Sequence, residues 1–192
     1  MKKAFTIVEV SILFVIFLIV AFLVAPLSLD DTMQAKNTSK WKGVQLEFGN
    51  IFYSINMQKE KEGFDFKTAF DDTISIELKG NAEPYRITYL NGASPSSTYR
   101  FDNYKLTIAK RIMAYKFLDE PEGDLQGYLM YDVNGSVGPN VWGRDVFGYN
   151  IYSDRFEPFC KQDSIAIQKQ ECGKGGTGLC CSNYYLIGGK FD

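Results

Sequence analysis

The sequence of 192 residues contains no histidine. This absence excludes Ser-His-Asp and Cys-His catalysis, HExxH metalloproteases and zinc sites built from cysteine and histidine. An excess of positive charge is also absent, because 21 lysine and arginine residues face 23 aspartate and glutamate residues. Nucleic-acid-binding proteins usually carry a basic excess, so this balance argues against that class. No phosphate-binding loop occurs and the carboxylates are scattered. The sequence therefore predicts a protein that is not an enzyme.

The longest apolar stretch lies near the N-terminus. Residues 12–25 are all apolar, and between Phe5 and Leu29 the few other residues are Thr6, Glu9, Ser11, Pro26 and Ser28. A helix over 5–29 would be about 37 Å long, enough to cross a hydrocarbon core of about 30 Å. Lys2 and Lys3 precede it, which predicts a cytoplasmic N-terminus. The sequence thus predicts one membrane span followed by an exported domain.

Three interpretations of this N-terminus compete. A cleaved secretory signal needs a small-x-small site, and the best one, ending at Ala25, has Leu23 at the other small position. A plain membrane anchor explains the length but not Glu9, because a carboxylate within an apolar helix usually has a partner. The third interpretation accounts for all of these residues and depends on a family resemblance.

The segment KKAFTIVE, residues 2–9, resembles the N-terminus of type IV pilins and of type II secretion pseudopilins. In that family a short basic leader ends in a small residue, usually glycine, followed by Phe, Thr and a Glu four residues after the Phe. The resemblance implies that prepilin peptidase cleaves between Ala4 and Phe5 and that Phe5 is N-methylated. Pro26 matches a helix-bending proline of the family, whereas Ala4 in place of glycine is a departure.

The resemblance also implies an assembly role for Glu9 and Pro26. The amine formed at Phe5 would pair with Glu9 of its own chain or of a neighbour, because an unpaired carboxylate is costly in an apolar bundle. The alternative is that Glu9 is protonated in lipid. Residues 1–4 are then a leader, 5–29 a transmembrane and polymerisation helix, and 30–62 its amphipathic second half.

The spacing of apolar residues supports that second half. Steps of three, four and seven separate Trp41, Val44, Phe48, Ile51, Phe52 and Ile55, which is the pattern of one helix face. Residues 63–192 are predicted to form an extracytoplasmic head. Strands are expected at 73–79, 85–90, 104–110, 128–133 and 146–152, while 112–118 is ambiguous between helix and strand. The predicted fold class is α+β, a long N-terminal helix packed on a small antiparallel β-sheet, as in pilins.

A loop rich in glycine and asparagine follows residue 131. Its pattern, DxNGxxGPNxxGRDxF over residues 132–147, resembles a C-terminal segment of many bacterial pilin-like proteins. The side chains of Asp132, Asn134, Asn140 and Asp145 bring together oxygen ligands of the kind that Ca²⁺ prefers. An EF-hand is excluded because its twelfth position is Gly143. Ca²⁺ is thus the one candidate cofactor, and an ordinary turn loop is the alternative.

Four cysteines lie near the C-terminus: Cys160, Cys172, Cys180 and Cys181. Their spacing contains no CxxC knuckle, which argues against zinc, and an exported domain favours disulfides over free thiols. A vicinal bridge would be strained, so two of the three connectivities remain. The disulfides are expected to staple the glycine-rich C-terminal loop.

These observations predict a pilin-like structural subunit, anchored in the inner membrane as a precursor and then part of an extracytoplasmic filament. The implied partners are identical or related pilin subunits, prepilin peptidase, the filament assembly platform and the inner membrane, with no nucleic acid. One alternative is a type II secretion pseudopilin that drives exoprotein secretion. Another is a membrane-anchored extracytoplasmic binding domain that does not assemble.

Overall fold

The computed structural model describes residues 7–60 and 62–190, and their side chains except those of 23–30. The chain divides into two compact units, an N-terminal unit, Met1–Lys36, and a C-terminal unit, Asn37–Asp192. Helix α1, Ile7–Asn56, contributes residues to both. The leader and the cleavage site at Ala4 and Phe5 lie outside the described residues.

The N-terminal unit corrects one part of the predicted fold. Within the described part of the chain, no helix combines the length and apolarity that crossing a membrane requires. The predicted membrane-spanning half at 5–29 is therefore wrong, and so is the inner-membrane localisation that depended on it.

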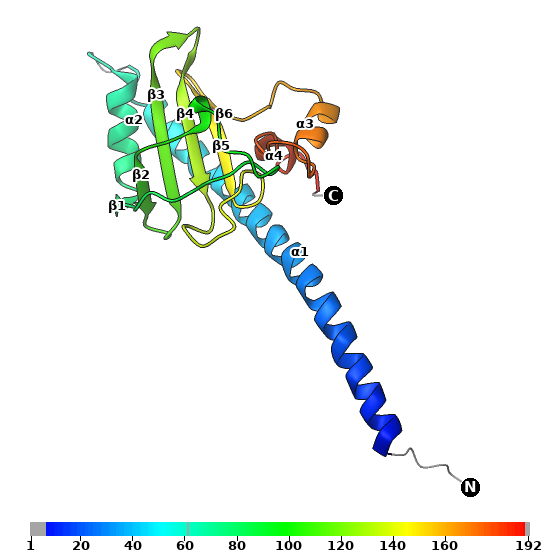
Figure 1. Cartoon of the computed structure of the whole chain (residues 1–192). Helices are drawn as coiled ribbons and strands as arrows, with labels where there is room; N and C mark the ends of the chain where they lie inside the picture. The colour runs from blue at the N-terminus through cyan, green and yellow to red at the C-terminus, as the bar shows by residue number, and fades with distance from the viewer. Residues whose placement is uncertain (1–6, 61, 191–192) are drawn as a thin grey trace. The chain divides into compact units, whose positions relative to one another are not determined.

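The C-terminal unit contains one antiparallel sheet of six strands in the order β1-β2-β3-β4-β5-β6 (Figure 1). The prediction of a small sheet was wrong. The strands are β1 Leu78–Asn81, β2 Tyr104–Thr107, β3 Ile112–Glu122, β4 Leu125–Asp132, β5 Val146–Tyr152 and β6 Phe156–Pro158. The helices of this unit besides α1 are α2 Phe66–Ser75, η1 Ser97–Tyr99, α3 Ile165–Glu171 and α4 Cys181–Tyr184.

The main core of this unit lies between α1 and the sheet. Trp41, Val44, Phe48 and Ile55 are 0–3% exposed, and they belong to the apolar face that the spacing predicts. The Trp41 ring stacks on Phe147 of β5, with a centroid separation of 4.8 Å. Its indole Nε1 donates a hydrogen bond of 2.8 Å to the carbonyl oxygen of Ser182. One buried side chain thus joins α1, the sheet and α4.

Helix α2 replaces the first three residues, 73–75, of the strand predicted at 73–79, and strand β1 begins only at Leu78. The Asp65 carboxylate caps the helix by accepting a hydrogen bond of 2.8 Å from the backbone N–H of Thr68. Phe70 and Ile74, four residues apart, are both fully buried, so the helical period continues into the segment that alternates in sequence. The two-residue alternation of 73–79 was therefore a misleading signal.

The segment predicted as a strand at 85–90 makes only an isolated bridge, Thr88 to Val141. The strand predicted at 104–110 ends at Thr107 because the chain turns at Lys110, whose φ is 60°. The ambiguous segment at 112–118 is strand β3.

Candidate calcium-binding loop

The β4–β5 loop, residues 133–145, connects two neighbouring strands and holds the predicted oxygen ligands. Asp132, the last residue of β4, is the register partner of Val146, the first residue of β5. The backbone N–H of Val133 donates a hydrogen bond of 2.9 Å to the carbonyl oxygen of Asp145. This pairing brings Asp132 and Asp145 to the same end of the two strands. Both residues are 0% exposed.

The Asp132 carboxylate accepts one hydrogen bond at each of its two oxygens. The Tyr85 hydroxyl donates a hydrogen bond of 2.7 Å to Oδ2, and the backbone N–H of Asn134 donates one of 3.0 Å to Oδ1. Burial is the largest influence on this group and raises the pKa of Asp132 to about 7. The Tyr85 hydrogen bond acts in the opposite direction, and the negative charge of Asp145 adds to the increase.

The Asp145 carboxylate organises the second half of the loop. It accepts hydrogen bonds of 2.8 Å and 2.7 Å from the backbone N–H groups of Asn140 and Val141. Burial raises the pKa of Asp145 despite these hydrogen bonds. The loop therefore encloses two carboxylates whose ionisation is disfavoured by burial, a situation that a bound cation would relieve.

Two amide oxygens in the loop are the strongest sign of a ligand. Within the described residues, the buried Oδ1 atoms of Asn134 and Asn140 have no hydrogen-bond partner. Leaving a buried acceptor unsatisfied costs about 1–3 kcal/mol. Two carboxylates and two unsatisfied amide oxygens form a set of hard oxygen donors, which fits Ca²⁺. A bound ion would supply positive charge, and these four residues would hold it.

The disulfide-linked C-terminal segment supports this loop. The structure pairs Cys160 with Cys180 and Cys172 with Cys181, one of the two connectivities that the sequence leaves open. Gly143 has a φ of +83°, and a Cβ atom at this position would lie 2.6 Å from the Cys181 Sγ. The Tyr185 hydroxyl donates a hydrogen bond of 3.2 Å to the Gly143 carbonyl oxygen. The disulfide-linked C-terminal segment therefore lies directly against the β4–β5 loop.

Cys160, Asp163 and Cys180 are also close enough to suggest a metal site. Both cysteines belong to one disulfide, so neither offers the thiolate that a metal would need.

Sequence reasoning missed Tyr85. This residue lies 47 positions before Asp132, in a segment predicted to be a strand. The alternating pattern of 85–90 gave no indication that the hydroxyl reaches the loop. In the sequence, only the Asp residues and the turn dipeptides near 132–145 indicated a candidate binding site.

The predicted assembly residues are placed only in part. Glu9 lies in the first turn of α1 and is exposed. Pro26 lies within α1, but its side chain is outside the described part.

Comparisons with protein-family models, curated proteins and solved structures found no match to this chain.

Proposed function

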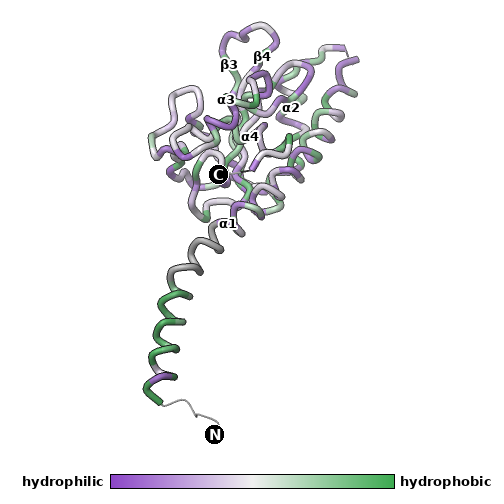
Figure 2. The backbone as a smooth tube through the Cα atoms, turned by 90° about the vertical axis from the view of Figure 1, so that its right-hand side faces the viewer, coloured by the Kyte–Doolittle hydropathy of each residue, from purple (hydrophilic) through white to green (hydrophobic). Residues whose placement is uncertain are grey.

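We propose that this protein is a pilin-like structural subunit that assembles into a filament through the N-terminal part of α1. The observation that carries the proposal is the exposure of the apolar stretch, residues 7–22, whose backbone is coloured mostly hydrophobic in Figure 2. Its large apolar side chains are 50–85% exposed, from Leu18 at the lower limit to Ile7 and Phe22 at the upper. Contiguous apolar surfaces of this kind mark interaction sites.

The pattern of this stretch favours several copies of the same helix as its partner. Residues 12–20 are exposed large apolar side chains in an unbroken run, so no side of the helix is polar. One partner would cover one side, whereas a bundle covers all sides. Contacts between different faces of identical subunits generate a helical filament when their rotation does not close into a ring.

Glu9 would set the register between subunits. Within a bundle of apolar helices, its carboxylate needs a counter-charge. The α-amino group created by cleavage between Ala4 and Phe5 would supply it, on the same chain or on a neighbour. Prepilin peptidase and a filament assembly platform are the further partners of this proposal.

The β4–β5 loop favours a second candidate function, that of a type II secretion pseudopilin. The unsatisfied oxygens of Asn134 and Asn140 support a bound Ca²⁺, and pseudopilins often have a calcium-binding C-terminal region. In either function the ion would be structural, because it would bridge the ends of β4 and β5.

Photo-crosslinking in the cells that make the protein tests the filament proposal. A crosslinking amino acid at Leu13, which is 57% exposed, should give a ladder of bands at multiples of the subunit mass. The same probe at Tyr53, which is 66% exposed in the C-terminal unit, is the matched control and should not give the same ladder. A folded protein that yields only monomer with the probe at Leu13 would contradict the proposal.

A further inference from the structure

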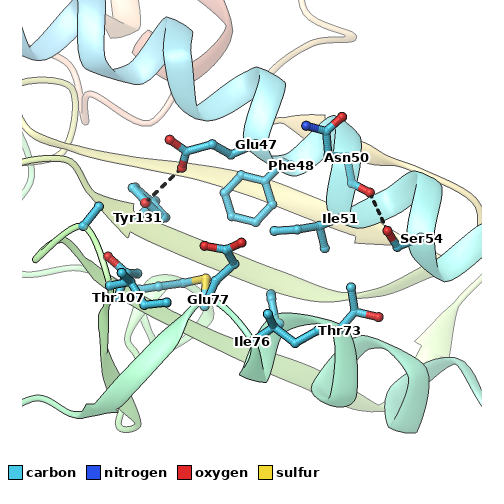
Figure 3. A pocket seen from close by; sticks show the side chains of 14 residues that line it. Glu47, Phe48, Asn50, Ile51, Ser54, Thr73, Ile76, Glu77, Thr107 and Tyr131 are labelled. Atoms are coloured by element: carbon cyan, nitrogen blue, oxygen red, sulfur yellow. Dashed lines mark hydrogen bonds between the residues drawn. The ribbon is translucent and has the colours of Figure 1, made fainter.

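The C-terminal unit contains a cleft that neither the calcium loop nor the filament proposal uses. It lies between α1 and the C-terminal end of α2, over the sheet, and has a volume of about 390 Å³ (Figure 3). Phe48, Ile74 and Met113 line it and are themselves 0–3% exposed. Its size and apolar lining are those of ligand-binding cavities in proteins.

Two carboxylates border this apolar cleft, and they differ in their partners. Glu47 on α1 accepts hydrogen bonds of 3.0 and 3.3 Å from the Arg111 guanidinium, so its charge is already balanced. Glu77 comes from the opposite wall, and its carboxylate points into the cleft, toward Phe48 (Figure 3). Within the described residues, the Glu77 side chain has no hydrogen bond or ion pair. The cleft therefore has a mostly apolar lining and, among the described residues, one carboxylate without an ion-pair partner.

The rim of the cleft extends its apolar surface outward. Ile76 and Ile108 both line the cleft, and they are 73% and 63% exposed. The backbone N–H of Ile108 donates a hydrogen bond of 2.9 Å to the Glu77 carbonyl oxygen, so both isoleucines lie beside Glu77 and form an exposed apolar rim that a larger occupant would cover. A small molecule contained in the cleft would leave these side chains uncovered, whereas a polypeptide segment would cover them.

We propose that this cleft binds a lysine side chain of a partner protein, with apolar residues on either side of that lysine. The methylene groups of the lysine lie along the apolar lining, and its ammonium group pairs with the Glu77 carboxylate. The long apolar stem and terminal charge of lysine match an apolar cleft with a carboxylate. The flanking apolar residues contact Ile76 and Ile108. The inference does not depend on filament assembly.

Fluorescence anisotropy with three labelled peptides and the full-length protein tests this proposal. The peptides are acetyl-Val-Lys-Leu-amide derivatives with lysine, norleucine or glutamate at the centre. Norleucine keeps the aliphatic chain without the ammonium group. The lysine peptide should bind up to about fivefold more tightly than the norleucine peptide, the range of a partly exposed ion pair. The glutamate peptide should bind most weakly.

Variants then assign the charge preference to Glu77. E77Q should abolish the difference between the lysine and norleucine peptides, while E83Q, an exposed glutamate that does not line the cleft, should preserve it. I108S should weaken both peptides equally. Equal binding of all three peptides, no saturable binding, or an unchanged preference in E77Q would overturn the proposal. Binding of n-hexylamine without binding of the lysine peptide would also overturn it, in favour of a small amine.

Discussion

Two stretches of helix α1 use apolar residues in different ways. In residues 7–22 the large apolar side chains are at least 50% exposed, and over 12–20 they follow one another without a polar face. In residues 41–55 the apolar side chains recur at helical spacing, and Trp41, Val44, Phe48 and Ile55 are nearly fully buried. Apolar residues at helical spacing form one face of the helix, and a single sheet of the same chain covers that face. A continuous pattern offers more apolar surface than the described chain covers, and this is the surface that the proposed contacts between subunits would bury.

The largest expected effect separates folding from assembly. Trp41→Ala removes a side chain that stacks on Phe147 and donates a hydrogen bond to the Ser182 carbonyl oxygen. The substitution should lower the free energy of unfolding by about 3–5 kcal/mol. Leu13→Ala, at an exposed position of the apolar stretch, should leave the free energy of unfolding unchanged. Urea unfolding followed by circular dichroism measures both. Equal losses in the two variants would contradict the division of α1 into a folding part and an assembly part.

The periodic stretch is also where sequence reasoning worked best. The spacing of Trp41, Val44 and Phe48 predicts their burial because an α-helix places such residues on one face. The continuous stretch carries no comparable information. Its apolar run led to a membrane-spanning prediction that is wrong for the described residues, because apolarity alone does not reveal what covers a helix.

The C-terminal unit shows the same limit at the candidate site. The candidate Ca²⁺ ligands Asp132 and Asp145 could be predicted from the loop sequence, because turn residues and carboxylates cluster there. The Tyr85 contact could not, because a side chain that reaches across 47 positions leaves no local pattern. Helix α2 was missed because the capping Asp65 and the burial of Phe70 outweigh an alternating segment.

The second prediction concerns the one acidic residue in the apolar stretch. Glu9→Val should give a folded subunit that enters filaments poorly, because breaking a buried charge pair costs about 3–5 kcal/mol. Electron microscopy of sheared filaments and immunoblots of the filament fraction measure incorporation. Glu62→Val, an exposed acidic residue of the C-terminal unit, is the control and should assemble normally. Normal incorporation of Glu9→Val would count against the pairing, and loss of the folded C-terminal unit would show that Glu9 has another role.

The third prediction confines a pH effect to the C-terminal unit. Burial raises the pKa of Asp132 from 3.8 to about 7, so the folded protein binds a proton more tightly than the unfolded chain. The stability of the calcium-free protein should therefore be highest below about pH 4 with respect to this group. It should fall as the pH rises to about 7, by about 4 kcal/mol at most.

Thermal unfolding between pH 4 and 8, after treatment with a chelator, tests this dependence. Asp132→Asn should flatten the curve, and Asp154→Asn, at an exposed carboxylate, should not. Added Ca²⁺ should restore stability at pH 8, because an ion that binds only the folded state stabilises it. A calcium-free protein that gains stability between pH 4 and 7 would show that the two buried carboxylates are already balanced.

The smallest expected effects come from the two disulfides, and they compare the two units most directly. Cys160–Cys180 closes a loop with a sequence separation of 20, and Cys172–Cys181 one with a separation of 9. Loop-closure entropy predicts that the free energy of unfolding falls by about 3.3 and about 2.6 kcal/mol, respectively, when each pair is replaced by serine.

Because both bridges lie in the C-terminal unit, neither replacement alters the exposed residues 7–22. Each variant should therefore melt at a lower temperature yet still enter filaments below its melting point. Cys172–Cys181 also lies against Gly143, so its loss should weaken Ca²⁺ binding, measured by calorimetry, more than loss of Cys160–Cys180 does. If both variants fail to assemble while folded, the contacts that build the filament extend into the C-terminal unit, and the division drawn within α1 would have to be abandoned.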